Sequence, residues 1–312
     1  MQTSMPDYTR ELEFAIATAI EAGEEIRRLY ASNSAQTETK ADESPVTDAD
    51  LASDRIIRAR IRETYPNDAI LTEEGVDDEA RLSAERVWIV DPIDGTIQFV
   101  ERTGQFDVLM ALVVDGRPVV SVMLQPPTGA FVGAVAGQGA IFGFAGSSER
   151  TVARLAPPGD HPRVATTIWL GAPESEPYLD RFADRLGVAP PEITQTGLIA
   201  RGHLDPAMPA LRDRADCRMI LAYERPLHGF LGIPIRGNGT MAWEWDYAAA
   251  DLVINEAGGR FTNWYGDYFT YNKPVPRNPG GLIIANSPEL HEQMLTAIAP
   301  EIEPVNASRG KV

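Results

Sequence analysis

The sequence is poor in cysteine and contains no long apolar run. Its single cysteine, Cys217, cannot form an intramolecular disulfide, so the sequence excludes a disulfide scaffold and favours a reducing compartment. No apolar stretch approaches the roughly 20 residues that a helix needs to cross a bilayer, and no basic segment followed by an apolar run opens the chain. We therefore expect a cytoplasmic protein without a membrane segment.

Positive charge is also scarce. Lysine and arginine together number 28 against 45 aspartates and glutamates, which gives a formal net charge of −17. Proteins that bind nucleic acids or anionic membranes carry basic surfaces, so we expect neither a nucleic acid nor a membrane as a partner. A small anionic substrate would need a bound cation to reverse the local field.

The first half of the chain has helical and then β-rich patterning. Apolar residues at helical spacing predict helices at 8–30 and 47–64, the second with Thr47 as its N-cap, and the polar segment 31–44 between them is expected to be a loop. Short β-rich runs then predict hairpins of an antiparallel sheet. These runs are 69–71, 87–90, 108–114, 119–124 and 131–135.

The second half alternates strands and helices. Strands are predicted at 164–169, 219–222 and 282–285, and helices at 178–186, 247–257 and 288–298. We place the domain boundary in the Ser-, Gly- and Pro-rich segment 147–162. It divides an α+β half (1–150) from an α/β half (151–312).

The most informative stretch is Trp88–Thr96, with the sequence WIVDPIDGT. An apolar strand leads to two carboxylates, Asp91 and Asp94. Pro92 keeps Asp91 out of the helical region, and Gly95 permits a tight turn. Two acids on one sharp turn repel each other, and Mg²⁺, which takes oxygen ligands, relieves that repulsion. The alternative is an ordinary acidic turn. The spacing differs from the Asp-x-Asp-Gly-Thr motif of haloacid-dehalogenase-type phosphatases, which we reject.

Three further acidic segments have both structural and functional interpretations. Glu73 and Glu74 end a short strand, where they are either solvated or paired with a cation. Asp246 precedes an Ala-rich helix and is either its N-cap or a metal ligand. Thr47 and Asp50 fit a capping box, which accounts for both residues without any catalytic role.

Together these segments resemble the inositol monophosphatase family of metal-dependent phosphatases. The strings that carry the resemblance occur in the family's order: Lys40…Pro45-Val-Thr-x-x-Asp50, Glu73-Glu74, Asp91-Pro-Ile-Asp94-Gly-Thr96 and Trp245-Asp246…Glu256-Ala-Gly-Gly. The resemblance implies an α/β fold, a layered α-β-α-β-α sandwich of the inositol monophosphatase/fructose bisphosphatase type. It also implies a homodimer and a Mg²⁺-dependent phosphomonoesterase that acts on a small phosphorylated metabolite.

The resemblance implies a set of metal ligands. For one Mg²⁺ they would be Glu73, Asp91 and the carbonyl of Ile93, and for a second they would be Asp91, Asp94 and Asp246. Glu73 and Glu74 together would shape a weaker third position. Two such ions about 3.5–4 Å apart can activate a water and neutralise the leaving oxygen, so no covalent nucleophile is needed.

The resemblance also implies catalytic residues, namely Glu73, Thr96 and Asp50. Thr96 would hydrogen-bond the attacking water while paired with Asp50, and the backbone N–H groups of Gly95 and Thr96 would bind the phosphate. We expect Cys217 to be a small core residue. We expect the four histidines to be surface residues rather than ligands: His161, His203, His228 and His291.

The substrate remains open at this point. Gly239 stands where the family carries a substrate-binding acid, so we do not expect inositol to be recognised in the usual manner. The candidate substrate residues are Glu244, Arg236 and Lys40. Three further residues could bind a second anionic group or be solvated loop residues, namely Arg201, Arg225 and His228.

Parts of the sequence resemble two branches of the family, the histidinol phosphatases and the 3′,5′-bisphosphate nucleotidases. Both are alternatives to an inositol monophosphatase-like activity. A non-catalytic regulatory or binding protein that retains the fold is the alternative from a different class of function.

Overall fold

The fold was described from a computed structural model, which covers residues 6–32, 37–39, 45–167, 175–194, 200–221, 225–233 and 240–308. The helices are α1 (Thr9–Ser32), α2 (Asp48–Thr64), α3 (Thr96–Val100), α4 (Glu176–Leu186), α5 (Pro209–Arg212), α6 (Cys217–Leu221), α7 (Glu244–Glu256) and α8 (Pro288–Ser308), with 3₁₀ turns η1 (Glu79–Ser83) and η3 (Arg201–His203). The strands are β1 (Thr37–Thr39), β2 (Pro45–Thr47), β3 (Ala69–Thr72), β4 (Arg86–Asp94), β5 (Asp107–Val114), β6 (Arg117–Gln125), β7 (Ala130–Val135), β8 (Gly139–Phe144), β9 (Arg150–Val152), β10 (Val164–Thr167), β11 (Glu192–Thr194), β12 (Gly229–Gly232), β13 (Thr240–Trp243), β14 (Arg260–Asn263), β15 (Arg277–Pro279) and β16 (Leu282–Ala285).

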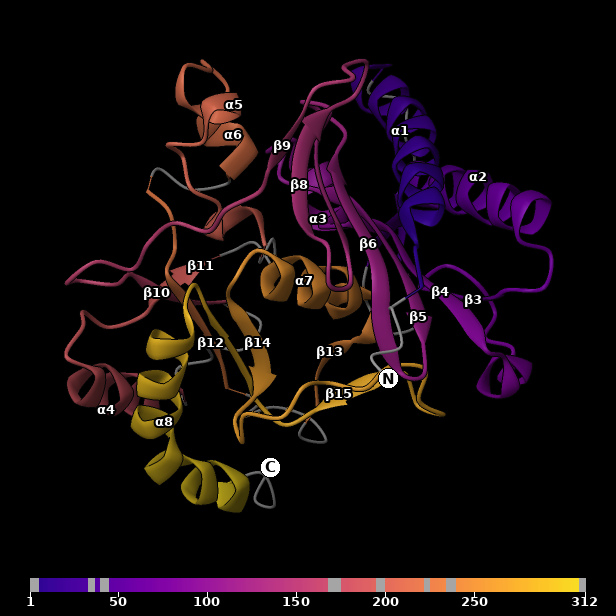
Figure 1. Cartoon of the computed structure of the whole chain (residues 1–312). Coiled ribbons are helices and arrows are strands. Elements are labelled where there is room, and N and C mark those ends of the chain that lie inside the picture. The colour runs from indigo at the N-terminus through magenta and orange to yellow at the C-terminus, as the bar shows by residue number, and fades with distance from the viewer. Residues whose placement is uncertain are drawn as a thin grey trace.

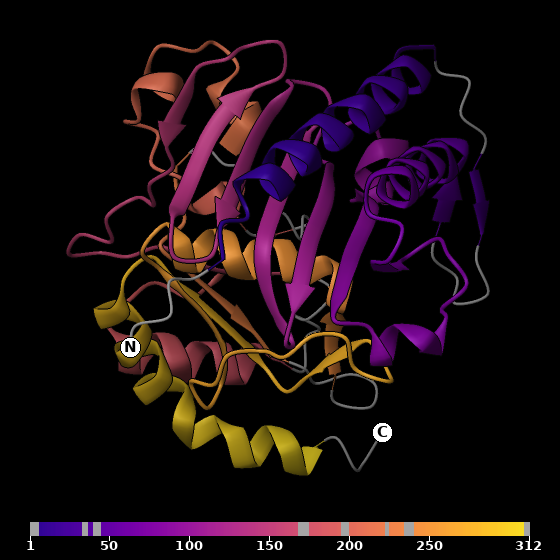
Figure 2. The ribbon, with the colours of Figure 1, turned by 45° about the vertical axis from the view of Figure 1, so that its right-hand side comes forward.

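Helices and sheets alternate in five layers (Figures 1 and 2). Helices α1 and α2 lie on the outer face of a seven-stranded sheet, and α7 lies between that sheet and a five-stranded one. Helices α4 and α8 cover the outer face of the five-stranded sheet, where their apolar residues form one buried cluster with β12 and β16. The predicted α-β-α-β-α sandwich is confirmed.

The seven-stranded sheet has the strand order β3-β4-β5-β6-β7-β8-β9. All neighbouring pairs from β4 onward are antiparallel, as the hairpin pattern predicts, while β3 and β4 run parallel. The β5–β6 hairpin turns at Asp115 and Gly116, whose φ angles are 51° and 73°. Positive φ at both turn positions matches the twist of the flanking strands and favours an Asp-Gly pair.

Helix α2 begins with the predicted capping box. The Ala49 N–H donates to Thr47 Oγ1, and the Thr47 N–H donates to Asp50 Oδ2 over 2.9 Å. These bonds satisfy backbone groups that a helix start otherwise leaves without partners. The apolar face of α2 then packs with α1 against the sheet through Ile57 and Ile61, both of which are fully buried.

Helix α7 is buried on nearly every side. Its residues from Tyr247 to Ile254 are buried, and they pack against β4, β5, β6, β7 and β8 on one side and β14 on the other. A helix that is apolar all round lies in the interior. The small alanine side chains let the two sheets approach α7 closely. Helix α7 also contacts β4.

The second sheet has the order β11-β10-β12-β16-β14. Its β10–β11 and β10–β12 pairs are parallel, and β16 pairs antiparallel with β12 and β14. The seven-stranded sheet ends at Val152 and the second sheet begins at Val164, so the segment 147–162 stays our proposed boundary between the halves. Among the described residues no helix combines the length and apolarity needed to cross a membrane.

Two local predictions are wrong. The segment predicted as a strand at 219–222 lies largely in helix α6, because a run of only four apolar residues has no period that separates helix from strand. The predicted loop 31–44 contains β1, which pairs antiparallel with β2. Residue 222 and the end of the strand predicted at 164–169 lie outside the described residues.

Candidate metal centre and active site

Two parallel strands bring the first acidic residues to one edge of the seven-stranded sheet. In the β3–β4 register Thr72 lies opposite Val90, and the Glu73 N–H donates to the Val90 carbonyl over 3.3 Å. Glu73 therefore comes level with Asp91, because the carboxyl ends of parallel strands meet at the same edge. Glu74 follows in the turn that the Gly75 N–H closes on the Thr72 carbonyl.

The backbone bends sharply between Asp91 and Asp94. Asp91 pairs with Leu109 and Asp94 with Asp107, so β4 carries one more residue than β5 across this interval. The extra residue makes a bulge, which re-aims the side chains that follow it. The Ile93 N–H donates to Asp91 Oδ1 over 3.0 Å and fixes that carboxylate within the bend.

Gly95 continues the bend in a left-handed conformation. Its φ is 97°, and a Cβ built there would lie 2.9 Å from the Gln105 carbonyl oxygen. Only glycine fits this position without strain. The sequence interpretation of Gly95 as the residue that permits the turn is confirmed, and helix α3 begins directly after it at Thr96.

Asp246 approaches from the other side of the site, on helix α7. The helix starts at Glu244, which puts Asp246 at its third position, and the Trp243 N–H donates to Asp246 Oδ2 over 2.8 Å. The N-cap interpretation of Asp246 is therefore wrong in position. Its carboxylate still accepts the Trp243 N–H at the helix start through Oδ2, so Oδ1 is not used by this bond.

The acids lie close enough together to affect the pKa values of Asp91, Asp94 and Asp246. Burial raises the pKa of Asp91 well above its usual range, and the charges of Glu73, Asp94 and Asp246 raise it further. Burial followed by the charges of Asp94 and Glu73 has the same effect on the pKa of Asp246. Burial, with the charges of Asp107 and Glu73, raises the pKa of Asp94 to about 7. Asp91 is buried, and the other three are half-buried and open to solvent.

The donor set suits Mg²⁺ in its chemistry. Four carboxylates, from Glu73, Asp91, Asp94 and Asp246, repel one another, and a hard divalent cation with oxygen ligands removes that repulsion. Within the described residues, however, no three His, Cys, Asp or Glu side chains close around a single ion position.

Asp50 and Thr96 form a hydrogen-bonded pair beside the acids. Thr96 Oγ1 lies 3.0 Å from Asp50 Oδ1 and 3.3 Å from the Ile93 carbonyl oxygen. Asp50 is 1% exposed, and burial raises its pKa although Thr47 and Thr96 hydrogen bonds oppose the shift. Asp50 thus has both contacts that its sequence context suggests, since one carboxylate caps α2 and also holds Thr96.

Of the three candidate substrate residues, only Glu244 lies within the described residues. It is fully buried, accepts the N–H groups of Asn272 (2.7 Å) and Lys273 (3.1 Å), and forms an ion pair with Lys273 Nζ. These contacts account for its carboxylate without a substrate. Lys40 and Arg236 lie outside the described part of the chain.

Arg201 and Asp107 form a buried ion pair that the sequence did not reveal. Arg201 Nε donates to Asp107 Oδ2 over 2.8 Å, and the side chains are 1% and 0% exposed. The two interpretations of Arg201, as an anion-binding residue or a solvated loop residue, are both replaced by this contact. Asp107 lies opposite Asp94 in the sheet, so the pair adjoins the acidic bend. The residues are 94 positions apart, and no local pattern connects them.

Two histidines predicted at the surface are buried, so that prediction is wrong for them. His203 Nδ1 pairs with Asn286 Oδ1, and burial lowers its pKa to about 4. His291 Nε2 pairs with Thr262 Oγ1 over 2.6 Å. Cys217 is partly buried against the main apolar core, close to the role expected for it.

Arg277 is a further residue that the sequence did not single out. It lies opposite Trp243 in the β13–β15 pair, with its guanidinium carbon 3.6 Å from the centre of the Trp243 ring. Trp243 in turn stacks on Trp245, with ring centres 4.8 Å apart. The charge of Arg277 is close enough to lower the pKa of Asp246 against the larger effect of burial. The positively charged guanidinium of Arg277 therefore lies at the rim of the acidic cluster.

Comparison with known proteins identifies the family. The model of the inositol monophosphatase family matches residues 7–177 and 207–303, which include the bend at Asp91–Thr96 and the start of α7. The chain belongs to the inositol monophosphatase family. Its members are generally Mg²⁺-dependent, and the chain is accordingly an enzyme of the phosphoric monoester hydrolase class.

Relatives within the family are named for different functions. A 3′(2′),5′-bisphosphate nucleotidase, CysQ of Aggregatibacter actinomycetemcomitans, is 29% identical over 85% of this chain and 88% of its own length. The histidinol-phosphatase of Mycobacterium tuberculosis is 28% identical over 92% and 97%. The Nus factor SuhB of Escherichia coli K12 is 27% identical over 93% and 96%.

The solved structures agree with the fold described above. The crystal structure of CysQ from Bacteroides thetaiotaomicron, a member of the inositol monophosphatase family, has a TM-score of 0.66 and 27% identity over 89% of this chain and 97% of its own. The inositol monophosphatase from Zymomonas mobilis has a TM-score of 0.67 and 25% identity over 94% and 99%.

Proposed function

We propose that this protein is a Mg²⁺-dependent phosphomonoesterase that hydrolyses a small phosphorylated alcohol by attack of a metal-activated water. The observation that carries the proposal is the hydrogen-bonded Asp50–Thr96 pair beside a set of acids, in which Glu73, Asp94 and Asp246 lie close enough to raise the pKa of Asp91. The four acids would hold the cations that a substrate phosphate needs in a chain of net charge −17.

The four acids would bind two metal ions. Glu73, Asp91 and the Ile93 carbonyl would hold one ion, and Asp91, Asp94 and Asp246 would hold the second. Asp91 is the most buried of these four acids, and the charges of Glu73, Asp94 and Asp246 all raise its pKa. This position suits Asp91 to bridge the two ions. Bound Mg²⁺ would supply the Lewis acidity that lowers the pKa of a water and neutralises charge on the phosphate.

Thr96 would orient the nucleophilic water. If its hydroxyl donates to Asp50 Oδ1, the nearer of its two acceptors, the lone pairs of Thr96 Oγ1 would accept a hydrogen from a water. Asp50 cannot turn away, because its other oxygen caps α2. The N–H groups of Gly95 and Thr96 stand at the start of α3, where the helix itself does not use them, and would receive phosphate oxygens.

Release of phosphate from p-nitrophenyl phosphate with and without Mg²⁺ tests the proposal. Alanine at Asp94 or Asp246 should abolish turnover while circular dichroism shows a folded chain. Undiminished turnover in either variant would overturn the proposal. The substrate follows from a panel of inositol 1-phosphate, histidinol phosphate, adenosine 3′,5′-bisphosphate and fructose 1,6-bisphosphate.

Arg277 favours one substrate class within that panel. A guanidinium held against Trp243 at the rim of the site can bind a second anionic group while the scissile phosphate lies over the acids. This supports 3′,5′-bisphosphate nucleotidase activity as the second candidate, in agreement with the name of the CysQ relative.

A further inference from the structure

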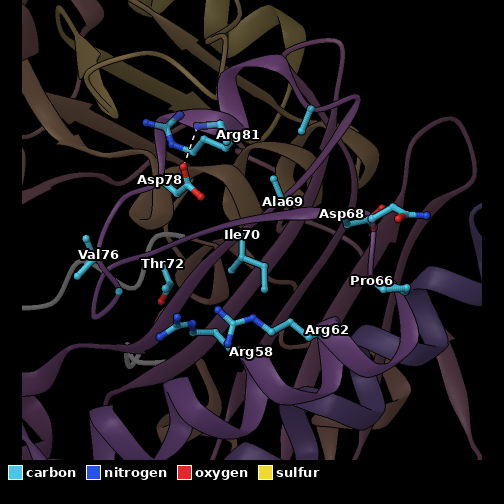
Figure 3. Close-up of a pocket in the computed structure, with 14 residues that line it drawn as sticks. Arg58, Arg62, Pro66, Asp68, Ala69, Ile70, Thr72, Val76, Asp78 and Arg81 are labelled. Carbon is cyan, nitrogen blue, oxygen red and sulfur yellow. Dashed lines mark hydrogen bonds between the residues drawn. The ribbon is translucent and has the colours of Figure 1, made fainter.

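A pocket of about 390 Å³ lies on the outer side of the seven-stranded sheet, between α2, the edge strand β3 and the turn η1 (Figure 3). This volume is within the range of small-molecule sites. Asp91, Asp94 and Asp246 do not line the pocket, so it is separate from the metal centre. Its wall nevertheless includes Thr72 and Gly75, which flank the Glu73–Glu74 turn.

Two arginines of α2 give this pocket a positive wall. Arg58 and Arg62 are four residues apart, which puts them on one face of the helix. Figure 3 shows both side chains extended side by side in the same direction, with the Arg58 guanidinium below Thr72. Ile70 points into the same space and adds an apolar surface.

The acids in the lining already have partners. Asp68 accepts hydrogen bonds from Arg86 Nε (3.0 Å) and Trp88 Nε1 (2.9 Å). Asp78 accepts the Ala80 N–H over 2.9 Å and caps η1. Among the described residues, neither carboxylate forms an ion pair with Arg58 or Arg62.

The arginines themselves are only partly neutralised. Arg58 Nη1 makes a single contact of 3.2 Å with Asp54 Oδ2. Arg62 forms no ion pair with any residue that the structure describes. The third arginine of the lining, Arg81, is fully engaged by Asp77 and by Asn272. Arg62 is thus an arginine of the lining that has no ionic partner among the described residues, and it lies beside the partly exposed Arg58.

We propose that this pocket is a second anion site that binds a small phosphate-bearing molecule through Arg58 and Arg62. Two guanidinium groups suit a dianion, because each offers paired N–H donors to phosphate oxygens. The organic part of the ligand would lie against Ile70 and the neighbouring alanines, Ala69 and Ala84.

The site is connected to the metal centre by a short chain of contacts. Asp54 bridges Arg58 and Thr72, since its Oδ1 accepts the Thr72 hydroxyl over 2.8 Å. A Cβ built at Gly75 would lie 3.9 Å from Arg58 Nη1, which places that guanidinium beside the turn. An anion that draws Arg58 away from Asp54 therefore changes the support of Thr72 and of the following Glu73. The site is regulatory in this sense.

Calorimetric titration of inorganic phosphate into the protein tests the site. The protein is stripped of metal by a chelating resin, so that phosphate cannot bind through cations at the acidic centre. Wild type should bind phosphate saturably, and Arg62→Gln should weaken binding at least about tenfold, the loss of one charged hydrogen-bonded contact. Arg60→Gln is the matched control, since Arg60 lies on the same helix but pairs with Glu21 and Glu63 away from the pocket.

The outcomes separate this site from the proposed function. No saturable binding by wild type, or equal binding by Arg62→Gln, overturns the second site while leaving phosphatase activity intact. Loss of phosphatase activity in Asp94→Ala with phosphate binding retained supports the second site independently.

The regulatory connection is tested by measuring Mg²⁺ affinity with and without phosphate. Phosphate should shift the Mg²⁺ affinity of wild type and of Arg62→Gln by amounts that differ about fivefold. Equal shifts contradict the connection.

Discussion

Thr96 and Asp50 come from the starts of two different helices, and a hydrogen bond of 3.0 Å joins the Thr96 hydroxyl to Asp50 Oδ1. The same carboxylate accepts the Thr47 N–H through its other oxygen. A structural cap therefore fixes the orientation of the hydroxyl that we assign to the nucleophilic water. The two roles of Asp50 do not compete, because each uses a different oxygen.

The Thr96 hydroxyl is tested by a substitution that keeps the side-chain shape. Thr96→Val should lower kcat about 100-fold, the lower end of what a positioned proton-transfer group contributes. Mg²⁺ affinity, measured by calorimetry, should change little. Thr96→Ser keeps the hydroxyl and serves as the matched control, with most of the activity retained. Full turnover by Thr96→Val would remove Thr96 from the mechanism.

Binding of Mg²⁺ should release protons below neutral pH. The pKa of Asp94 is raised to about 7, and a carboxylate must be ionised to bind the cation. Calorimetry at pH 6 in two buffers with different ionisation enthalpies should give different apparent enthalpies, and at pH 8.5 the difference should shrink. Identical enthalpies in both buffers at pH 6 would contradict the raised pKa.

The same pKa makes the metal-free protein less stable as pH rises. Asp94 has an ordinary pKa of 3.8 in the unfolded chain and one of about 7 in the fold. Between pH 4 and pH 7 the folded state binds more protons, so its stability falls as pH increases through that window. Thermal melting in the presence of a chelator should show this fall, and Mg²⁺ should reverse it near pH 7.

Asp94→Asn should stabilise the metal-free protein. The amide removes repulsion with Asp107 and Glu73, so the metal-free variant should melt at a higher temperature than wild type at pH 8. Mg²⁺ should then add little further stability to the variant. Asp184→Asn, at an exposed position of α4, is the control and should change neither property. A lower melting temperature for metal-free Asp94→Asn would argue against the clustering of charge.

Arg277 should discriminate between substrates. Replacing it with glutamine should lower kcat/KM for adenosine 3′,5′-bisphosphate about tenfold, since one charged hydrogen-bonded contact is lost. The kcat/KM for p-nitrophenyl phosphate, which has no second anionic group, should stay within about twofold. Equal losses for both substrates would make Arg277 a general support of the site rather than a specificity residue.

The buried pair of Arg201 and Asp107 should matter for stability. Arg201→Met leaves Asp107 buried without its partner and should cost about 3–5 kcal/mol in the free energy of urea unfolding. The double variant Asp107→Asn/Arg201→Met has no buried charge at this position and should recover part of the loss. A single-variant cost below about 1 kcal/mol would contradict the importance of the pair.

The bend at Asp91–Gly95 could be predicted from the sequence because its causes are local. Pro92 restricts the residue before it, and Gly95 adopts a φ of 97° that other residues rarely adopt. The capping box at Thr47 and Asp50 is local in the same way. The family resemblance added Asp246. The sequence predicted it as the residue before the helix, whereas it is the third residue of α7.

The contacts that tune the site could not be predicted, because they join distant segments. Arg201 meets Asp107 only after the second half of the chain folds against β5, and Arg277 meets Trp243 through the β13–β15 register. Short apolar runs such as the one in α6 carry too little periodic information to separate helix from strand. Buried His203 likewise pairs with Asn286, which is 83 residues away in the sequence.

Phosphate release from p-nitrophenyl phosphate by Asp246→Asn in saturating Mg²⁺ tests the central assignment most directly. Asparagine can still accept the Trp243 N–H, so the start of α7 keeps its cap while the charge of one proposed ligand is removed. We expect wild type to depend strictly on Mg²⁺ and the variant to lose at least about 100-fold in kcat/KM while remaining folded. Wild-type turnover by Asp246→Asn would contradict a metal centre formed by Glu73, Asp91, Asp94 and Asp246.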